Sequence, residues 1–472
     1  MAIVRDRSLL DADGSISNKL LFSCIKEHKQ EVEKRLNLLN AYYDGEHEIR
    51  NRRFKNKNIP NNKIVCNHAE YISDLSVGYV FGVPISYTGD GSDVINDNFT
   101  VIDEDSHNNE LALDLSIFGI GYELLYMNTD ETPIMELATL SPLNTFVVFD
   151  NTVKEKPIFA VHYYPNYDID NNLKDYTVEV YTESEKLIYE AKTLDSEGTY
   201  VKEIDLEEHY FSGIPIIEYK NNKKCKGDFE GVISIIDAYN KLQSDRVNDK
   251  EQLVDAFLVL IGQNLGDTKD EVSETVRYLI EQKIIELDEG GDAKWLVKQL
   301  SEDQVEILKK SLKDDIHEFS KVPCLTDENF VGNSSGVAMK YKLLGFEQLG
   351  RTKERYFKKG LRKRLRLMQN IEGIRANKFD IAKIDISMKR SLPVDDALLA
   401  NIAQQTEGFI SWETRVKNYD PEIDVEAEKK RLANEKAEKF EEQQKAFGFP
   451  YDKEDNPDNL DVDKKEDDKV NE

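Results

Sequence analysis

The sequence predicts an α+β protein that combines one sheet-rich region with several long helices. Residues between about 79 and 219 contain short runs rich in β-branched and aromatic residues, separated by Asn, Asp, Gly and Pro turns. Outside that region, apolar residues recur at helical spacing, most clearly in residues 229–256, 301–320 and 337–372. Together these two patterns indicate an antiparallel-rich sheet combined with long amphipathic helices.

The composition is that of an acidic globular chain. Its 472 residues include 63 Lys and Arg against 91 Asp and Glu, for a formal net charge of −28. This balance excludes a generally basic nucleic-acid coat. A hydrophobic fraction of 39% is sufficient for real cores, and the length suggests roughly three domains of about 150 residues each.

Neither a membrane helix nor a secretion signal is expected. The longest weakly polar stretch, residues 75–89, is too short to span a bilayer and contains three glycines and Pro84. Arg5 and Asp6 stand where a signal sequence needs apolar residues, so we expect the chain to stay in the compartment that made it. The four cysteines form no CxxC pair, which is typical of a reducing cytoplasm.

The N-terminal part begins with a helix and a basic segment. Apolar residues at helical spacing predict an amphipathic helix over residues 17–43, which ends at Asp44 and Gly45. Residues 49–65 then carry six basic side chains and no acidic one. They are the first of two basic islands in an acidic chain.

Two long helices flank a small insert in the second half of the chain. Helical spacing predicts the helices over residues 229–256 and 301–320. The segment between them, residues 257–300, is punctuated by glycines and reads as a small α/β unit. Its predicted pieces are a helix over 270–282 and strands over 283–289 and 293–300.

A polar loop and a basic helix follow. Pro323 ends the preceding helix, and residues 326–336 are polar, with two glycines. The third long helix, predicted over 337–372, has eleven Lys and Arg against two Glu between residues 340 and 366. This stretch is the second basic island.

The C-terminal part returns to a strand and then to helices. Residues 378–390 are predicted as a strand that rejoins a sheet, and helical patterns run from 394 to 447. From residue 452 onward the side chains are nearly all charged or Asn, so we expect this tail to be disordered.

One enzymatic motif is present, in a context that does not support it. Residues 332–336 fit the GxSxG nucleophile elbow of hydrolases, with Ser334 as the nucleophile. An elbow needs a buried strand before it and a triad histidine later in the chain, whereas residues 326–330 are polar and the last histidine is His317. We therefore interpret the motif as a Gly/Ser loop. Phosphate-loop and HExxH motifs are absent from the sequence, so we predict no enzyme, no cofactor and no metal site.

The second basic island has two open interpretations. Lys and Arg concentrated on one element can contact phosphates even in an acidic protein. The basic residues spread around most of the helix instead of following one stripe, which favours pairing with carboxylates of a neighbouring subunit. The candidates for phosphate or intersubunit contacts are Lys340, Lys342, Arg351, Lys353, Arg355, Lys358, Lys359 and Arg362.

Several segments are informative in combination. They are LLNAYYDGEHEI at 38–49, NNKIVCNHAEYISDLSVGYVFGVPISY at 61–87, NSSGVAMKYKLLG at 333–345, and the order helix, insert, helix, polar loop, long helix over 229–374. With these segments the chain resembles the portal proteins of tailed bacteriophages, of the type found in long-tailed siphophages. The resemblance extends over most of the chain to about residue 390.

The resemblance implies a function in the virion. It implies a ring of about twelve subunits at one capsid vertex, which forms the channel for double-stranded DNA during packaging and ejection. The implied partners are terminase, capsid and scaffold proteins, and later the head-completion and tail connector proteins. The implied location is the portal vertex of the virion, and the host cytoplasm during assembly, with no membrane contact.

The resemblance also implies a division of the chain into parts. These are a wing over 1–228, stem helices over 229–256 and 301–321, a clip over 257–300, a tunnel loop over 322–336, a long helix and wing return over 337–390, a helical crown over 391–448, and an acidic tail over 449–472.

Candidate site residues follow from this division. Those that would face DNA in the tunnel loop are Asp327, Glu328, Asn329, Phe330, Asn333, Ser334 and Ser335. Those that would contact partners in the clip are Asn264, Asp267, Lys269, Glu286, Asp288 and Trp295.

Other features of the residues agree with a portal. Two long amphipathic helices around a small insert must bury their apolar stripes against each other and against neighbours, which favours an assembly. An acidic chain with polar loops suits a conduit through which DNA slides without sticking. Two alternatives remain: a hydrolase that uses Ser334, and a non-enzymatic head scaffold or adaptor protein without a DNA channel.

Overall fold

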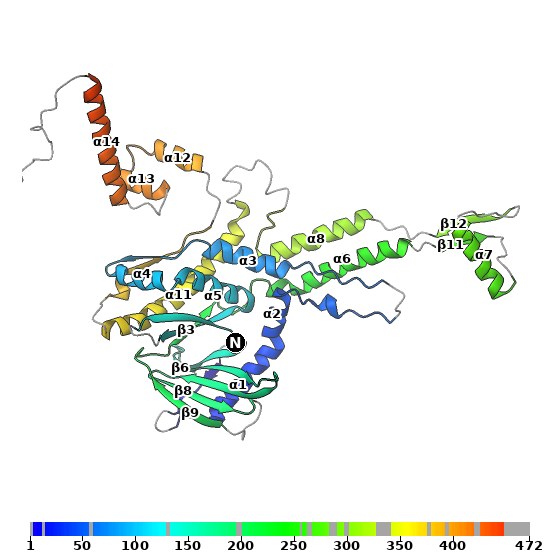
Figure 1. Cartoon of the computed structure of the whole chain (residues 1–472), viewed down its shortest axis with the longest axis horizontal. Coiled ribbons are helices and arrows are strands. Elements are labelled where there is room, and N and C mark those ends of the chain that lie inside the picture. The colour runs from blue at the N-terminus through cyan, green and yellow to red at the C-terminus, as the bar shows by residue number, and fades with distance from the viewer. Residues whose placement is uncertain are drawn as a thin grey trace, which may run out of the picture. The chain divides into compact units, whose positions relative to one another are not determined.

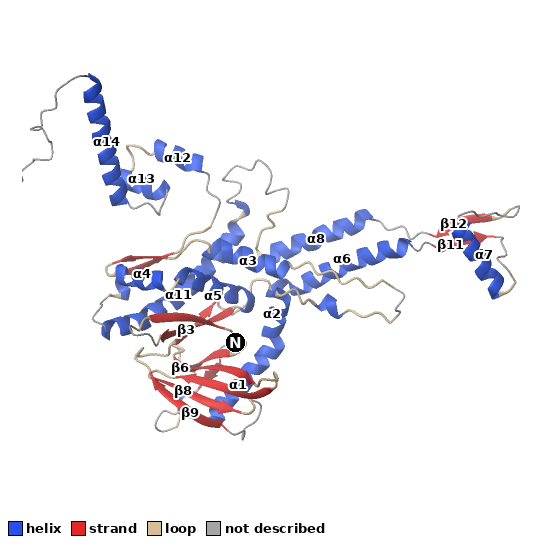
Figure 2. Ribbon diagram, viewed as in Figure 1, coloured by secondary structure: helices blue, strands red, loops and turns tan. Residues whose placement is uncertain are grey.

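The chain forms two compact units, Met1–Ser391 (unit 1) and Leu392–Glu472 (unit 2), in a computed structural model. Unit 1 mixes helices and sheets, which confirms the α+β prediction (Figures 1 and 2). It contains two hydrophobic cores, one between the helices and the three-stranded sheet and one beneath the six-stranded sheet. The described residues are 3–11, 15–55, 60–128, 133–194, 201–254, 257–261, 267–282, 290–296, 302–326, 341–374, 379–391, 396–419 and 425–447.

The helix predicted over 17–43 is present, with one change of winding. It consists of α1 (Asn18–Glu31), a π-helical turn (Val32–Leu36) and α2 (Asn37–Tyr43). The Ser17 side chain caps it by accepting a hydrogen bond from the Leu20 N–H. π-Turns of this kind often mark functional or strained positions, and this one carries Arg35, which reaches across the fold.

The β-rich region begins later than the sequence indicated. Residues up to 118 are helical, in α3 (His68–Phe81), α4 (Ser92–Val101) and α5 (Glu104–Phe118), apart from the short strand β2 (Ser86–Gly89). The prediction of β-rich structure from about residue 79 was therefore wrong for this part. Strand β3 (Ile120–Met127) follows α5 directly, because Gly119 has a φ of +80° and ends the helix with a sharp turn.

The sheets are antiparallel-rich, as predicted. One has the strand order β1-β5-β6-β7-β8-β9, and only the β1 to β5 pairing is parallel. The second has the order β10-β3-β4. Their further strands are β1 (Ile3–Arg5), β4 (Met135–Leu140), β5 (Thr145–Asp150), β6 (Pro157–Tyr167), β7 (Leu173–Tyr181), β8 (Glu185–Ala191), β9 (Val201–Glu208) and β10 (Ile216–Lys220).

The two predicted helices around the insert form a pair, α6 (Ile233–Val254) and α8 (Glu302–Ser320). In the insert, strands β11 (Phe257–Ile261) and β12 (Asp292–Leu296) pair antiparallel, and α7 (Lys269–Gln282) lies between them in sequence. Strand β12 agrees with the strand predicted over 293–300 as far as Leu296. Residues 297–300 and the strand predicted over 283–289 lie outside the described residues. β11 was not predicted, because a short continuous apolar run suits a helix or a buried strand equally.

The basic helix is α11 (Leu344–Ile374), which packs against β10. The contact is close because Gly360 lies against the ring of Tyr219, where a Cβ atom would collide. After α11, strand β13 (Ile384–Ser387) pairs with β2, so the chain returns to a sheet as the pattern over 378–390 predicted.

Unit 2 is helical in its described part, as the sequence predicted for 394–447. Its helices are α12 (Asp396–Gln405), α13 (Trp412–Tyr419) and α14 (Val425–Phe447). The tail that was predicted to be disordered lies outside the described residues. Across the helices that the structure describes in both units, no segment is long and apolar enough to cross a membrane.

Candidate channel and docking surfaces

Charged side chains link the two helices of the pair α6 and α8. Arg246 of α6 donates hydrogen bonds to Glu302 (3.0 Å) and Glu306 (2.9 Å) of α8. All three side chains are partly solvent-exposed, so the pairing contributes modestly to stability and mainly fixes how the helices align.

The apolar stripe predicted on α8 is only partly covered within one chain. Ile316 is fully buried and Leu312 packs against the core, but Leu308 remains 50% exposed. On the same helix, Ile307 is 70% and Phe319 is 65% exposed. A helix that leaves this much apolar surface uncovered is typical of an assembling protein.

Three side chains along one face of α6 hold the helix to the segment before α3. Asn240, Ser244 and Asn248 lie on one face of the helix at intervals of four residues. Their side-chain oxygens accept hydrogen bonds from the backbone N–H groups of three alternate residues in the extended segment before α3. The bonds are Cys66 to Asn240 (2.8 Å), Ile64 to Ser244 (2.9 Å) and Asn62 to Asn248 (2.8 Å).

The first basic island supports the same junction. Arg52 donates to Asp245 of α6 (2.6 Å), and also to the backbone oxygen of Asn62 (2.6 Å). This part of the island therefore holds α6 against the body of unit 1 and is not a free cationic surface.

The start of the predicted tunnel loop is anchored to α3. The Tyr71 hydroxyl donates to the backbone oxygen of Pro323 (3.1 Å) and accepts from the backbone N–H of Leu325 (2.9 Å). The candidate channel residues Asp327, Glu328, Asn329, Phe330, Asn333, Ser334 and Ser335 lie outside the described residues, as do the GxSxG motif and Lys340.

The clip candidates are only partly described. Asp267 and Lys269 are exposed at the start of α7, and Trp295 belongs to β12, where its backbone pairs with Leu258. Asn264, Glu286 and Asp288 lie outside the described residues. Their roles in partner binding stay predictions.

The candidates on the basic helix separate into three groups. Lys353 is 3% exposed and pairs with Asp228 of the same chain, so its assignment to phosphate or intersubunit contacts is corrected. A buried ammonium requires a partner, and Asp228, in the connection between β10 and α6, supplies one that is remote in sequence. Arg351 and Lys358 pair along the helix with Glu347 and Glu354. The third group consists of four exposed candidates, Lys342, Arg355, Lys359 and Arg362.

The most buried cation of the basic helix was not among the candidates. Arg364 has no exposed surface and donates to Glu104 (2.5 Å), to Glu123 (3.0 Å) and to the side-chain oxygen of Asn108 (2.8 Å). His107 also bonds Glu123, at 2.9 Å. The sequence signal that could have found Arg364 is its position four residues after Gly360, on the face that approaches the sheet.

The charges in this cluster satisfy one another. Burial by itself would raise the pKa of the Glu123 carboxyl, but Arg364 and His107 together lower it to about 2. Among the described residues no group of three or more His, Cys, Asp or Glu side chains could hold a metal ion. The cluster therefore fixes α11 against α5 and β3.

Comparison with known proteins assigns the chain to a class. The family described as "Phage portal protein, SPP1 Gp6-like" matches residues 22–442. The portal protein of Clostridium phage phiCD119 is 25% identical over 393 residues, which cover 79% of this chain and 85% of that protein. The portal protein of Bacillus phage SPP1 is 22% identical over 306 residues, which cover 61% of this chain and 58% of that protein.

Solved structures are also similar to the chain, among them the neck of a native GTA particle computed with C12 symmetry. It has a TM-score of 0.40 and 12% sequence identity, over 75% of this chain and 88% of that chain.

The chain belongs to the SPP1 Gp6-like family of phage portal proteins. It is thus a bacteriophage portal protein, a head-to-tail connector component of the virion at the capsid vertex, as the resemblance indicated. The family is a structural one, which agrees with our interpretation of the GxSxG motif as a loop and not as a catalytic site.

Proposed function

We propose that this chain assembles into a ring of about twelve copies whose central channel conducts double-stranded DNA during packaging and ejection. The observation that carries the proposal is the family match over residues 22–442. The uncovered apolar residues of α8 and the formal charge of −28 support it, because the first favours assembly and the second limits adhesion of DNA.

In this proposal the parts of the chain have separate roles. The helices α6 and α8 form the stem, and the insert between them is the clip that docks terminase and later the head-completion and tail connector proteins. The tunnel loop at 322–336 faces the DNA, the wing extends over 1–228 and 337–390, and residues 391–448 form the crown. Capsid and scaffold proteins meet the ring during assembly in the host cytoplasm.

Electron microscopy of the purified protein tests the assembly. Class averages sorted by rotational symmetry should show rings of about twelve or thirteen subunits around an open pore. Monomers or closed dimers that persist across salt and protein concentration would contradict the ring. That outcome would favour the alternative, a scaffold or adaptor protein without a channel.

The tunnel loop can be tested separately. Replacing Asn333, Ser334 and Ser335 by Trp should reduce DNA packaging and leave ring assembly intact, because bulky side chains would narrow the channel. A matched control replaces Ile169 and Asp170 by Trp, in the exposed turn between β6 and β7. Normal DNA filling with the loop variant would argue against a channel-facing loop.

A further inference from the structure

A cavity rich in lysine lies where α11 meets two turns of unit 1. Its volume is about 1030 Å³, and its wall contains eight lysines and one arginine against four glutamates. The first turn joins β5 to β6 and carries Lys154 and Lys156. The second follows β10 and carries Lys223, Lys224 and Lys226.

Most of the carboxylates in this cavity already have partners. Glu230 pairs with Arg35 of the π-turn (2.9 Å), and Glu218 pairs with Lys220 (3.3 Å). The five turn lysines form no ion pair with any residue that the structure describes. The cavity therefore has a surplus of positive charge that a single chain leaves uncompensated.

Lys363 of α11 lines this cavity among other cations. Enclosure by the cavity wall lowers the pKa of its ammonium group, and the like charges of Lys220, Arg366 and Lys359 lower it further, against the opposing effect of Glu218. An anionic group placed in the cavity would relieve this repulsion.

The edge of the six-stranded sheet formed by strand β9 has the complementary, negative charge. Strand β9 ends the strand order on this side, and no strand among the described residues pairs with its outer side. Glu203, Asp205 and Glu208 are exposed on it and form no ion pair with any residue in the described ranges. Ile204 is 49% and Leu206 is 46% exposed. Folded proteins generally cover or protect an edge of this kind.

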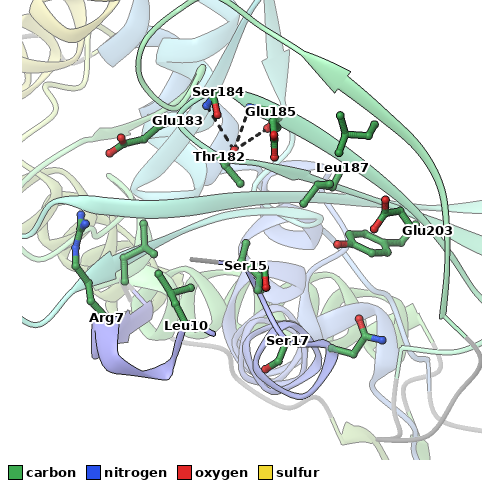
Figure 3. Close-up of a pocket in the computed structure, with 15 residues that line it drawn as sticks. Arg7, Leu10, Ser15, Ser17, Thr182, Glu183, Ser184, Glu185, Leu187 and Glu203 are labelled. Carbon is green, nitrogen blue, oxygen red and sulfur yellow. Dashed lines mark hydrogen bonds between the residues drawn. The ribbon is translucent and has the colours of Figure 1, made fainter. Parts of the chain in front are cut away.

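A second cavity makes this edge more acidic. It has a volume of about 890 Å³ and lies between the N-terminal segment and strands β8 and β9. Figure 3 shows Glu183, Glu185 and Glu203 around it, with Arg7 at one end. Arg7 is already bonded to Asp150 (3.3 Å), so the glutamates dominate the charge of this face.

One chain cannot join these two surfaces. Strand β9 is four strands away from β5, which corresponds to about 19 Å across the sheet at about 4.8 Å per strand. A basic surface and an acidic surface at different places on the same chain suit a head-to-tail contact between identical copies. Repetition of such a contact generates a ring when the rotation between neighbouring copies closes on itself.

We propose that the lysine-lined cavity receives the acidic edge of the sheet, strand β9 with Glu203, Asp205 and Glu208, from a second copy of this chain. The proposal rests on the ring proposed above and specifies one of its contacts. A DNA duplex fits the cavity less well, because a convex rod would touch only the rim, whereas a sheet edge can enter it.

Charge reversal tests the contact in the full-length protein. K223E/K224E should weaken ring formation at least about tenfold in protein concentration, as measured by native mass spectrometry and electron microscopy. E203K/D205K should have a similar effect. Because each copy carries both surfaces, the fourfold variant K223E/K224E/E203K/D205K should recover most of the assembly.

The matched control is K19E/K26E, which reverses two exposed lysines of α1 and should leave assembly unchanged. Rings that form normally with K223E/K224E would overturn the contact but not the portal function. Loss in both double variants without recovery in the fourfold variant would overturn β9 as the occupant. Intact rings with weakened binding of double-stranded DNA would assign the cavity to DNA, and a wild-type protein that forms no rings would contradict the proposed function itself.

Discussion

At the scale of single residues, the basic helix is more structural than its composition suggested. Arg364 and Lys353 are buried, and both form ion pairs inside the chain. The remaining exposed cations are fewer and more local than a count of eleven implies. Buried pairs of this kind fix a unique alignment of elements at the cost of desolvating two charges.

Arg364 should be essential for stability. Arg364→Ala removes the guanidinium that pairs with the buried carboxylates of Glu104 and Glu123. The variant should therefore have a free energy of unfolding that is lower by about 3–5 kcal/mol. Urea titration followed by circular dichroism measures this. Arg366→Ala, an exposed residue on the same helix, should change it by less than about 0.5 kcal/mol. Equal midpoints for the two variants would refute the role of the cluster.

Asp114 of α5 should make stability depend on pH. Burial, with the nearby Glu110 carboxylate, raises the pKa of Asp114 to about 7. The folded state therefore favours the protonated carboxyl, and the stability that it contributes is complete below about pH 4 and lost as the pH rises through about 7.

Asp114→Asn should accordingly raise the melting temperature at pH 8 and have a much smaller effect at pH 4.5. Differential scanning fluorimetry across that range measures the difference. Asp97→Asn, at an exposed position of α4, serves as the control and should give similar shifts at both values. A stabilisation by Asp114→Asn that is equal at both pH values would rule out ionisation as the cause.

At the scale of elements, α6 is positioned by hydrogen bonds to an extended segment as well as by apolar packing. Residues four apart on the helix rise by about 6 Å, close to the spacing of alternate residues in an extended chain, so the two patterns match over three bonds. These bonds hold residues 240–248 of α6 against the body of unit 1.

Asn240 makes hydrogen bonds to two different segments at this junction. Its side chain accepts from the Cys66 N–H and bonds His47 (2.7 Å), and it is fully buried. Asn240→Ala should lower the free energy of unfolding by about 1–3 kcal/mol, because a buried N–H group loses its acceptor. Lys241→Ala, at the exposed neighbouring position, should be almost neutral in the same denaturant titration. Faster hydrogen exchange at Cys66 in N240A alone would locate the effect.

At the scale of the whole molecule, the chain is two units and not the three that its length suggested. Unit 1 keeps its sheets, helix pair and basic helix together, because α11 packs against α3 and β10, and strand β13 pairs with β2, about 300 residues earlier in the chain. Ser391 closes the unit through a hydrogen bond from its N–H to the backbone oxygen of Tyr79 (3.1 Å).

A fragment ending at Ser391 should therefore fold by itself. In calorimetry, the fragment should unfold at nearly the same temperature as the main transition of the full-length protein. The reason is that unit 1 is a compact unit with its own internal contacts. A fragment of residues 1–391 that aggregates or melts well below the full chain would show that unit 2 is needed for the fold of unit 1.

Sequence patterns were enough to predict the α+β class, the helix over 17–43, the helix pair around an insert, the basic helix and the portal family. These features depend on local periodicity and on recognisable segments. Three features were visible only in the folded chain: that α4 and α5 replace expected strands, which lysines have partners, and that Arg364 meets Glu104 and Glu123, 260 and 241 residues earlier in the chain. Such pairs depend on topology, because periodicity identifies the face of a helix that is buried but not the element that covers it.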